Sequence, residues 1–160
     1  MHFKFPFNES KPIVGEASVD IDKPLPDVFS FIGERFFENY PKWATEVVDF
    51  EPLDGQEVVV GAKARQVRKD GDNEIESFFS IIDFECCSKL IFQGLNEPYK
   101  HSYLLEDADP KKITRLTFRF ELMELEVFMR PFEKLIRYAI EDGAETTVAN
   151  IKELILVEGN

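Results

Sequence analysis

The chain has few of the residues on which catalytic and metal sites are usually built. Its 160 residues include only two histidines and two cysteines, and the cysteines, Cys86 and Cys87, are adjacent. A structural zinc site needs four ligands at separated spacings, and no nucleophile elbow, phosphate-binding glycine loop or dinucleotide fingerprint occurs. We therefore expect no metal ion and no cofactor. Neighbouring residues on a strand face opposite sides, so an internal bridge would be strained and we expect reduced thiols.

Basic runs and long apolar stretches are also missing. The formal net charge is −12, and no run of Lys or Arg is longer than Lys111-Lys112. Because phosphate backbones bind through neutralising cations, nucleic acids and anionic membrane surfaces are poor partners for this chain. No stretch approaches the ~20 apolar residues that span a bilayer, and the first residues lack the apolar core of a signal peptide. These absences predict a cytoplasmic protein with no integral membrane segment.

Phenylalanine, by contrast, is abundant. The chain has 16 Phe against four Tyr and one Trp, and hydrophobic residues make up 44% of it. Phe contributes a large apolar area and no polar atom that needs a partner, so we expect a broad and mostly dry interior. A chain of this length fits one domain, which would bury about 70% of the surface that the unfolded chain exposes.

The residue pattern predicts an α+β protein. Residues 1–13 show little periodicity and are interpreted as an irregular N-terminal arm. Alternation predicts a strand at 16–22, after which Pro24 and Pro26 favour the start of a short helix at 25–32. A second short helix should end at Pro41. Six further strands, separated by turn residues and joined as an antiparallel meander, are predicted at 47–53, 58–68, 74–84, 89–95, 99–106 and 113–122.

The last third of the chain changes to helical periodicity. Apolar residues recur at three- and four-residue steps from Phe128 to Leu154, which predicts one amphipathic helix at 131–156. At 1.5 Å per residue this helix would span about 39 Å, enough to cross a whole sheet. Gly143, Ala144 and Thr147 are small, so they mark where the helix leaves most room for a ligand or another backbone, or permits a bend.

The order of these elements resembles the helix-grip fold of the START-like (SRPBCC) superfamily. The matching segments are residues 17–24 with 27–29, 40–43 (Tyr-Pro-Lys-Trp) with 47–48, 60–62, 88–92 and 114–117. One departure is Lys111-Lys112-Ile113, where family members often carry glycines. The resemblance implies a single START-like domain over residues 1–160, with a curved, antiparallel, seven-stranded sheet wrapped on the C-terminal helix and two short helices after the first strand.

Strand parity nominates the residues that face the helix. On each of the strands 89–95, 99–106 and 113–122, the more apolar row is predicted to face inward. Strand 74–84 has two competing apolar rows, one with Phe79 and Ile81 and one with Phe78 and Ile82; either a partner subunit or a β-bulge would explain both. The predicted ligand-binding residues come from the inward rows, from the aromatic turn at residues 40–43 and from the C-terminal helix. They are Trp43, Phe92, Tyr99, His101, Tyr103, Phe118, Phe120, Leu135, Ala139 and Gly143.

Several of these residues have two interpretations. His101 with Tyr103 is the one candidate for catalysis, because a neutral imidazole between phenols can orient a ligand carbonyl or hydroxyl, or act as an acid or base. Alternatively, Tyr99, His101 and Tyr103 are core residues that satisfy one another, the backbone or buried water. Trp43 lies either at the rim of a cavity or in the core. The facing of Arg65 is open: an inward guanidinium would anchor an anion, and an outward one would be solvated.

Three functions fit this resemblance. The first is binding or carriage of a hydrophobic or amphipathic small molecule, such as a lipid, quinone or polyketide, in a cavity between sheet and C-terminal helix. The second is a polyketide cyclase or dehydratase that uses His101 and Tyr103. The third is a protein-interaction module of the heat-shock ATPase activator type, and a homodimer is compatible with the second apolar row. The fold alone does not choose among them, although the lack of a catalytic motif disfavours an enzyme.

Overall fold

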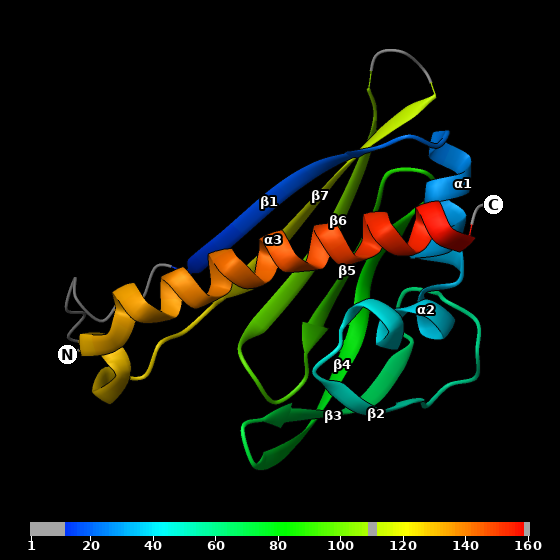
Figure 1. Ribbon diagram of the computed structural model, residues 1–160. Coiled ribbons are helices and arrows are strands. Elements are labelled where there is room, and N and C mark those ends of the chain that lie inside the picture. The colour runs from blue at the N-terminus through cyan, green and yellow to red at the C-terminus, as the bar shows by residue number, and fades with distance from the viewer. Residues whose placement is uncertain (1–11, 109–111, 159–160) are drawn as a thin grey trace, which may run out of the picture.

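A single antiparallel sheet and a long helix dominate the computed structural model, which describes residues 12–108 and 112–158 (Figure 1). The sheet has seven strands in the order β1-β7-β6-β5-β4-β3-β2. Their bounds are β1 Ile13–Ile21, β2 Val47–Pro52, β3 Lys63–Asp70, β4 Asn73–Glu85, β5 Lys89–Gly94, β6 Tyr99–Ala108 and β7 Ile113–Leu122. Every neighbouring pair is antiparallel. The predicted α+β helix-grip architecture is thereby confirmed.

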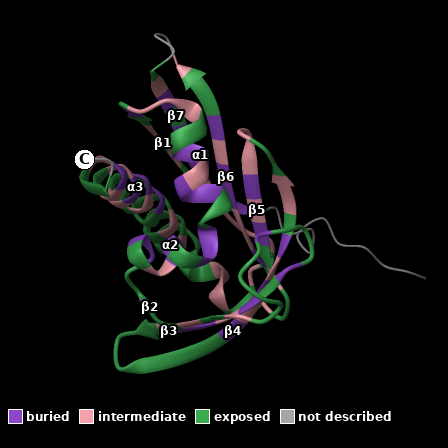
Figure 2. Cartoon of the chain, turned by 90° about the vertical axis from the view of Figure 1, so that its right-hand side faces the viewer, coloured by how far each residue is buried: buried purple, intermediate pink, exposed green. Residues whose placement is uncertain are grey.

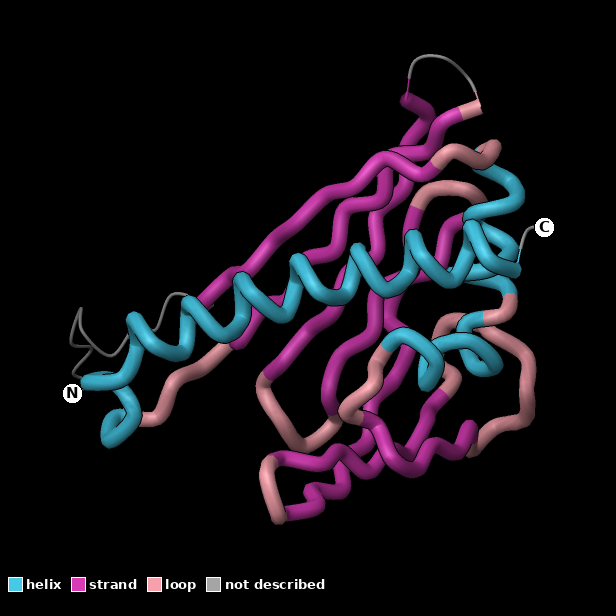
Figure 3. The backbone as a smooth tube through the Cα atoms, viewed as in Figure 1, coloured by secondary structure: helices cyan, strands magenta, loops and turns pink. Residues whose placement is uncertain are grey.

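The helices lie on one side of this sheet (Figure 3). Helix α1 (Leu25–Phe29) continues into a π-helical turn at Ser30–Glu34, and α2 (Phe36–Trp43) follows. Helix α3 (Glu133–Glu158), preceded by a 3₁₀ turn at Val127–Phe132, crosses the sheet obliquely and contacts β1 and β7. Its C-terminal end lies beside the two short helices (Figure 1). No helix in the described part of the chain is long and apolar enough to cross a membrane.

Only the second half of α3 belongs to the core. Its buried residues are Ala144, Val148, Ile151 and Ile155. In the first half, Leu135 and Tyr138 are 66% and 70% exposed. The apolar periodicity predicted one continuous buried stripe, but the buried residues occur only from Ala144 onward, although the backbone of Ile140 already packs closely on Gly15 of β1. Figure 2 shows the same helix with buried residues on the side that faces the sheet.

The core between the helices and the sheet is aromatic. Phe36 from α2 contacts the rings of Tyr40, Trp43, Phe92 and Tyr103 with centroid distances between 5.1 and 6.0 Å. The predicted inward rows of β5, β6 and β7 are buried here, including Leu90, Phe92, Tyr99, Tyr103, Leu116 and Phe118. This interior accounts for the excess of Phe in the sequence.

The two apolar rows of β4 are explained by a β-bulge. Phe79 and Ile81 are fully buried, whereas Ile82 is 43% exposed. The register with β5 shifts between Ile81 and Asp83, so one extra residue changes which side chains face inward. The row with Phe79 and Ile81 therefore belongs to the core and offers no surface to a partner subunit.

Two element starts differ from the prediction. Strand β1 begins at Ile13, which pairs with Leu122 and is 2% exposed, so Ile13 does not belong to an irregular arm; residues 1–11 of that arm lie outside the described residues. Strand β3 begins at Lys63, later than the predicted residue 58, because Gly61 with φ of +95° turns the chain first.

The helix boundaries differ as well. Helix α2 continues through Pro41 to Trp43 instead of ending at the proline. Proline removes one backbone donor, but the next turn is kept because the Ala44 N–H donates to the Tyr40 carbonyl at 3.0 Å. Pro131 lies in the 3₁₀ turn, and α3 begins two residues after it, at Glu133.

Candidate functional site

A partly open cavity of about 550 Å³ lies between α3 and the sheet. It is bounded by β3, β6 and β7, by the end of α2 and the segment after it, and by residues 136–150 of α3. The apolar part of its lining is Trp43, Phe118, Phe120, Ile136, Ala139, Ile140, Gly143 and Ala144. The polar part is Thr45, Glu46, Arg68, His101, Asp142, Thr146, Thr147 and Asn150. Such a lining suits an apolar body with a polar group.

The helix leaves room above this cavity at one glycine. A Cβ added to Gly143 would meet no atom within 4 Å, which confirms that the helix leaves space there. At Gly15 in β1 the opposite holds, because a Cβ would lie 2.7 Å from the backbone oxygen of Ile140. The close approach of β1 at Gly15 thus sets where Ile140 and the adjacent turn of α3 lie over the cavity.

Strand register places His101 among aromatic rings. His101 is opposite Phe92 on β5 and opposite Phe120 on β7. Ring centroids of Phe92, Phe120 and Phe118 lie 4.4, 4.8 and 5.4 Å from that of the imidazole. Both ring nitrogens are buried without a hydrogen-bond partner. Burial, with a smaller effect from the charge of Arg68, lowers the pKa of His101 to about 3, so the imidazole is neutral near pH 7.

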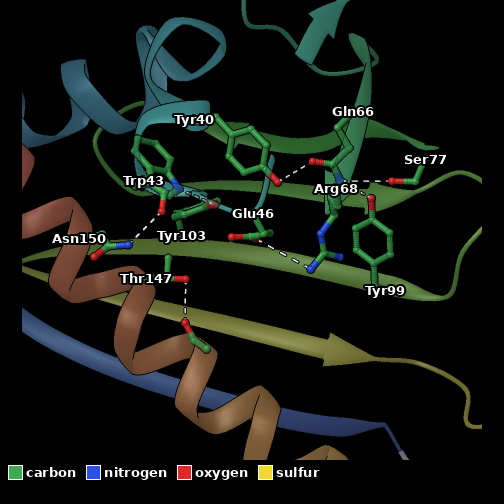
Figure 4. Close-up of polar contacts among 11 residues, drawn as sticks. Tyr40, Trp43, Glu46, Gln66, Arg68, Ser77, Tyr99, Tyr103, Thr147 and Asn150 are labelled. Atoms are coloured by element: carbon green, nitrogen blue, oxygen red, sulfur yellow. Dashed lines mark hydrogen bonds and ion pairs between the residues drawn. The ribbon is translucent and has the colours of Figure 1, made fainter. Parts of the chain in front are cut away.

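The neighbouring tyrosines, in contrast, have partners in the core (Figure 4). Tyr103 accepts a hydrogen bond from the Trp43 indole at 3.2 Å, and Tyr99 accepts one from the Gln66 amide at 3.3 Å. Gln66 in turn accepts from Tyr40 at 2.8 Å. Burial raises the pKa of the Tyr40 and Tyr103 hydroxyls well above 10, so both phenols stay protonated. The interpretation as satisfied core residues therefore describes Tyr99 and Tyr103, but not His101.

Two arginines of β3 have different surroundings. Arg65 is outward and binds Asp49 at 2.9 Å and Glu76 at 2.6 Å, so the inward anion anchor is excluded. Arg68 lines the cavity and contacts Glu46 at 3.9 Å (Figure 4). Sequence reasoning left Arg68 unassigned. Alternation along β3 could have predicted its inward position, because Arg68 is two residues after the buried Gln66 and four after the buried Ala64.

Helix α3 is hydrogen-bonded to the end of α2 beside the cavity. The Asn150 amide donates to the Trp43 carbonyl at 3.1 Å and connects the two elements, whereas the Thr147 hydroxyl donates within α3 to the Gly143 carbonyl at 2.8 Å (Figure 4). Trp43 is 2% exposed and also lines the cavity. The burial supports the interpretation of Trp43 as a core residue, and the same side chain forms part of the cavity wall.

The predicted ligand-binding residues fall into three groups. Those that line the cavity are Trp43, His101, Phe118, Phe120, Ala139 and Gly143. Phe92, Tyr99 and Tyr103 are buried in the adjacent core and are not part of the lining. Leu135 is exposed and lies outside the lining, whereas the next residue, Ile136, is part of it. Contact of any of them with a ligand remains a prediction.

Sequence reasoning missed part of the lining on α3. Ile136 and Ile140 belong to the predicted apolar stripe but were not among the predicted ligand-binding residues. Asn150 was missed as well, because the spacing of apolar residues does not show which polar side chains line a cavity. Within the described ranges, no cluster of His, Cys, Asp or Glu could hold a metal ion. Cys86 and Cys87 are free, with their sulfur atoms 3.5 Å apart, in the turn between β4 and β5.

Comparison with known proteins finds similar structures but no similar sequences among protein families or curated proteins. No protein-family profile matches the chain, and no curated protein sequence is significantly similar to it. Many solved structures share its fold. The Zhui aromatase/cyclase from a Streptomyces species has a TM-score of 0.75 at 9% identity, over 94% of this chain and 97% of its own.

Two further structures are similar. The polyketide-cyclase-like protein Cgl2372 from Corynebacterium glutamicum has a TM-score of 0.60 at 23% identity, covering 92% of this chain and 94% of that one. Ara h 8.0201 has a TM-score of 0.63 at 12% identity, with 92% and 99% covered. At such identities the likeness shows the fold alone. That shared fold is the helix-grip arrangement that the sequence resemblance predicted.

Proposed function

We propose that this protein binds a hydrophobic or amphipathic small molecule, of the lipid, quinone or polyketide kind, in the cavity between α3 and the sheet. The observation that carries the proposal is a cavity of about 550 Å³ whose lining presents more apolar than polar surface and includes the rings of Trp43, Phe118 and Phe120. Pockets for small molecules usually enclose roughly 300–1,000 Å³ and present a few polar groups that fix orientation. Proteins with this fold typically bind hydrophobic ligands, which agrees with the proposal.

Native mass spectrometry of protein purified without detergent from several hosts tests this function. A carrier should retain a small molecule, visible as an added mass that disappears under denaturing conditions. Extraction and identification of that molecule would name the ligand. The bare protein mass from every host, together with no uptake of added hydrophobic probes, would contradict the proposal.

The polyketide cyclase or dehydratase alternative has weaker support at the site. An effective general base has a pKa near the working pH, and that of His101 is lowered to about 3. Tyr103 is paired with Trp43 and is not part of the cavity lining. Binding and orientation of a ligand are therefore better supported than proton transfer.

The interaction-module alternative has lost the observation that motivated it. The row with Phe79 and Ile81 is fully buried and so cannot form an outer docking surface. The same burial removes the reason to expect a homodimer from this row. Oligomeric state in solution stays a prediction that size-exclusion chromatography with light scattering would test.

A further inference from the structure

One side chain of the cavity lining, His101, has no hydrogen-bond partner for its buried ring nitrogens. Both ring nitrogens of His101 are buried and have no hydrogen-bond partner, although the imidazole lines the cavity. A neutral imidazole has one N–H donor and one acceptor nitrogen. Burial of such groups without partners is unfavourable, so an unpaired one in a native structure needs an explanation.

The protein itself offers no partner on the sheet side of the ring. Phe92, Phe118 and Phe120 provide only apolar surface there. The other buried polar side chains of this wall are already paired, since Tyr99 bonds to Gln66 and Tyr103 to Trp43. On the helix side, Thr147 and Asn150 donate to backbone carbonyls. The remaining neighbour of the ring is the cavity, which His101 lines.

The surroundings also restrict the charge of the group that could approach. Glu46 and Asp142 line the cavity together with the single guanidinium of Arg68, so its formal charge is negative and an anion is disfavoured. A cation beside His101 meets the same burial and the same positive charge of Arg68 that disfavour protonation of the ring. An uncharged group avoids both penalties.

From these observations we infer that the ligand carries an uncharged hydroxyl group, alcoholic or phenolic, that hydrogen-bonds to the imidazole of His101. A hydroxyl can donate to the acceptor nitrogen or accept from the N–H, whichever faces the cavity, whereas a carbonyl can only accept. The apolar body of the ligand then lies against Phe118, Phe120 and the Ile136–Ile140 side of α3. This inference rests on the proposed binding function of the cavity.

Three naphthalene probes of nearly equal size test the inference: 2-naphthol, 2-methylnaphthalene and 2-naphthoate. Their dissociation constants are measured by calorimetry and by probe fluorescence near pH 7. Wild-type protein should bind 2-naphthol at least about tenfold more tightly than 2-methylnaphthalene, a difference of about 1.4 kcal/mol. It should also bind 2-naphthol more tightly than 2-naphthoate.

The variant His101→Phe should erase this preference while it still binds 2-methylnaphthalene. Phe is similar in size to His and fits among the surrounding rings, so the variant is expected to fold; His101→Gln, which keeps polar atoms, should retain part of the preference. Ser102→Ala is the matched control, because Ser102 is the next buried residue of β6 and faces the opposite side of the sheet. Its preference for 2-naphthol should equal that of the wild type.

The outcomes separate the two proposals. Equal affinity for 2-naphthol and 2-methylnaphthalene, a preference that survives His101→Phe, or tightest binding of 2-naphthoate would overturn the hydroxyl inference and leave the binding function standing. Failure of all three probes to bind, with no ligand retained in native mass spectrometry, would overturn both.

Discussion

At the scale of single residues, His101 differs from every other buried polar group of the cavity wall. Tyr99 and Tyr103, which face the same side of β6, are also buried, but their hydroxyls are paired inside the core. Whether a buried polar residue is a structural or a binding residue therefore depends on its partners. These partners are residues far apart in the chain, such as Trp43 and Tyr103.

The neutral state of His101 predicts a pH dependence of stability. Its pKa is about 3 in the folded chain, against 6.5 for an unburied histidine. Between these values the unfolded chain binds a proton that the native protein does not, so stability is lost as the pH falls below about 6.5. Each pH unit within this window contributes up to about 1.4 kcal/mol.

Comparison with His101→Phe isolates this contribution. Urea unfolding at pH 5 and pH 7 should show that the wild type loses about 1–2 kcal/mol more than the variant on acidification. The charged and titratable groups nearest the ring, Arg68, Tyr99, Glu46 and Asp142, are present in both proteins, so their effects largely cancel. Equal losses in the two proteins would show that His101 is protonated in the folded chain.

At the scale of elements, the contact between β1 and α3 depends on the absence of a side chain at Gly15. A Cβ there would lie 2.7 Å from the carbonyl oxygen and carbon of Ile140, a distance at which the backbone must move. Since Ile140 also lines the cavity, this contact links strand packing to the shape of the binding site.

Gly15→Ala should therefore destabilise the protein by about 1–3 kcal/mol, the usual effect of overpacking. Chemical denaturation measures this loss, and the affinity for 2-naphthol should fall in parallel as α3 shifts. Glu16→Ala is the control on the same strand, because Glu16 faces the other side and forms only an exposed ion pair with Arg119 at 3.3 Å. Its effect should be within about 1 kcal/mol. Similar losses in both variants would contradict the proposed close contact.

Gly143 allows the opposite experiment on α3. A side chain at this position meets open space, and glycine inside a helix is less favourable than alanine by roughly 0.5–1 kcal/mol. Gly143→Ala should therefore raise the free energy of unfolding by about that amount. Gly143→Leu should also fold, but its larger side chain would occupy the cavity and weaken 2-naphthol binding at least tenfold. Unchanged affinity in Gly143→Leu would show that ligands do not approach this turn of the helix.

At the scale of the whole molecule, stability is distributed unevenly along α3. The second half of the helix is anchored by Val148, Ile151 and Ile155 in the aromatic core. The first half lines the cavity with Ile136, Ala139 and Ile140 and exposes Leu135 and Tyr138. An element with few buried contacts opens more readily than its neighbours, so this half of the helix suits the passage of a ligand.

Hydrogen exchange measured by mass spectrometry should show this division. Amides of residues 133–142 are expected to exchange faster than those of 148–156, and saturation with 2-naphthol should slow exchange in the first group. Uniform protection along α3, with no change on probe binding, would mean that the helix acts as one rigid unit.

Much of this architecture could be predicted from the sequence, because strand parity and helix periodicity are local consequences of where apolar residues occur. The inward rows of β5, β6 and β7 were identified in this way, as was the open position at Gly143. Local sequence patterns did not predict strand limits or side-chain facing where these depend on a neighbouring strand that is distant in the sequence. Ile13 is strand because Leu122 pairs with it, and β4 has two apolar rows because a bulge opposite β5 changes its facing.

The sequence by itself thus indicated the order of strands and helices, through which it resembles the helix-grip fold, and an interior rich in Phe, because apolar side chains recur at strand and helix spacing. Only the tertiary structure decided which polar groups in that interior are satisfied. Hydrogen-bond partners such as Trp43 with Tyr103 come from separate elements, and neither periodicity nor composition records them. The cavity, the inward Arg68 and the unpaired His101 likewise depend on how α3, β3, β6 and β7 come together.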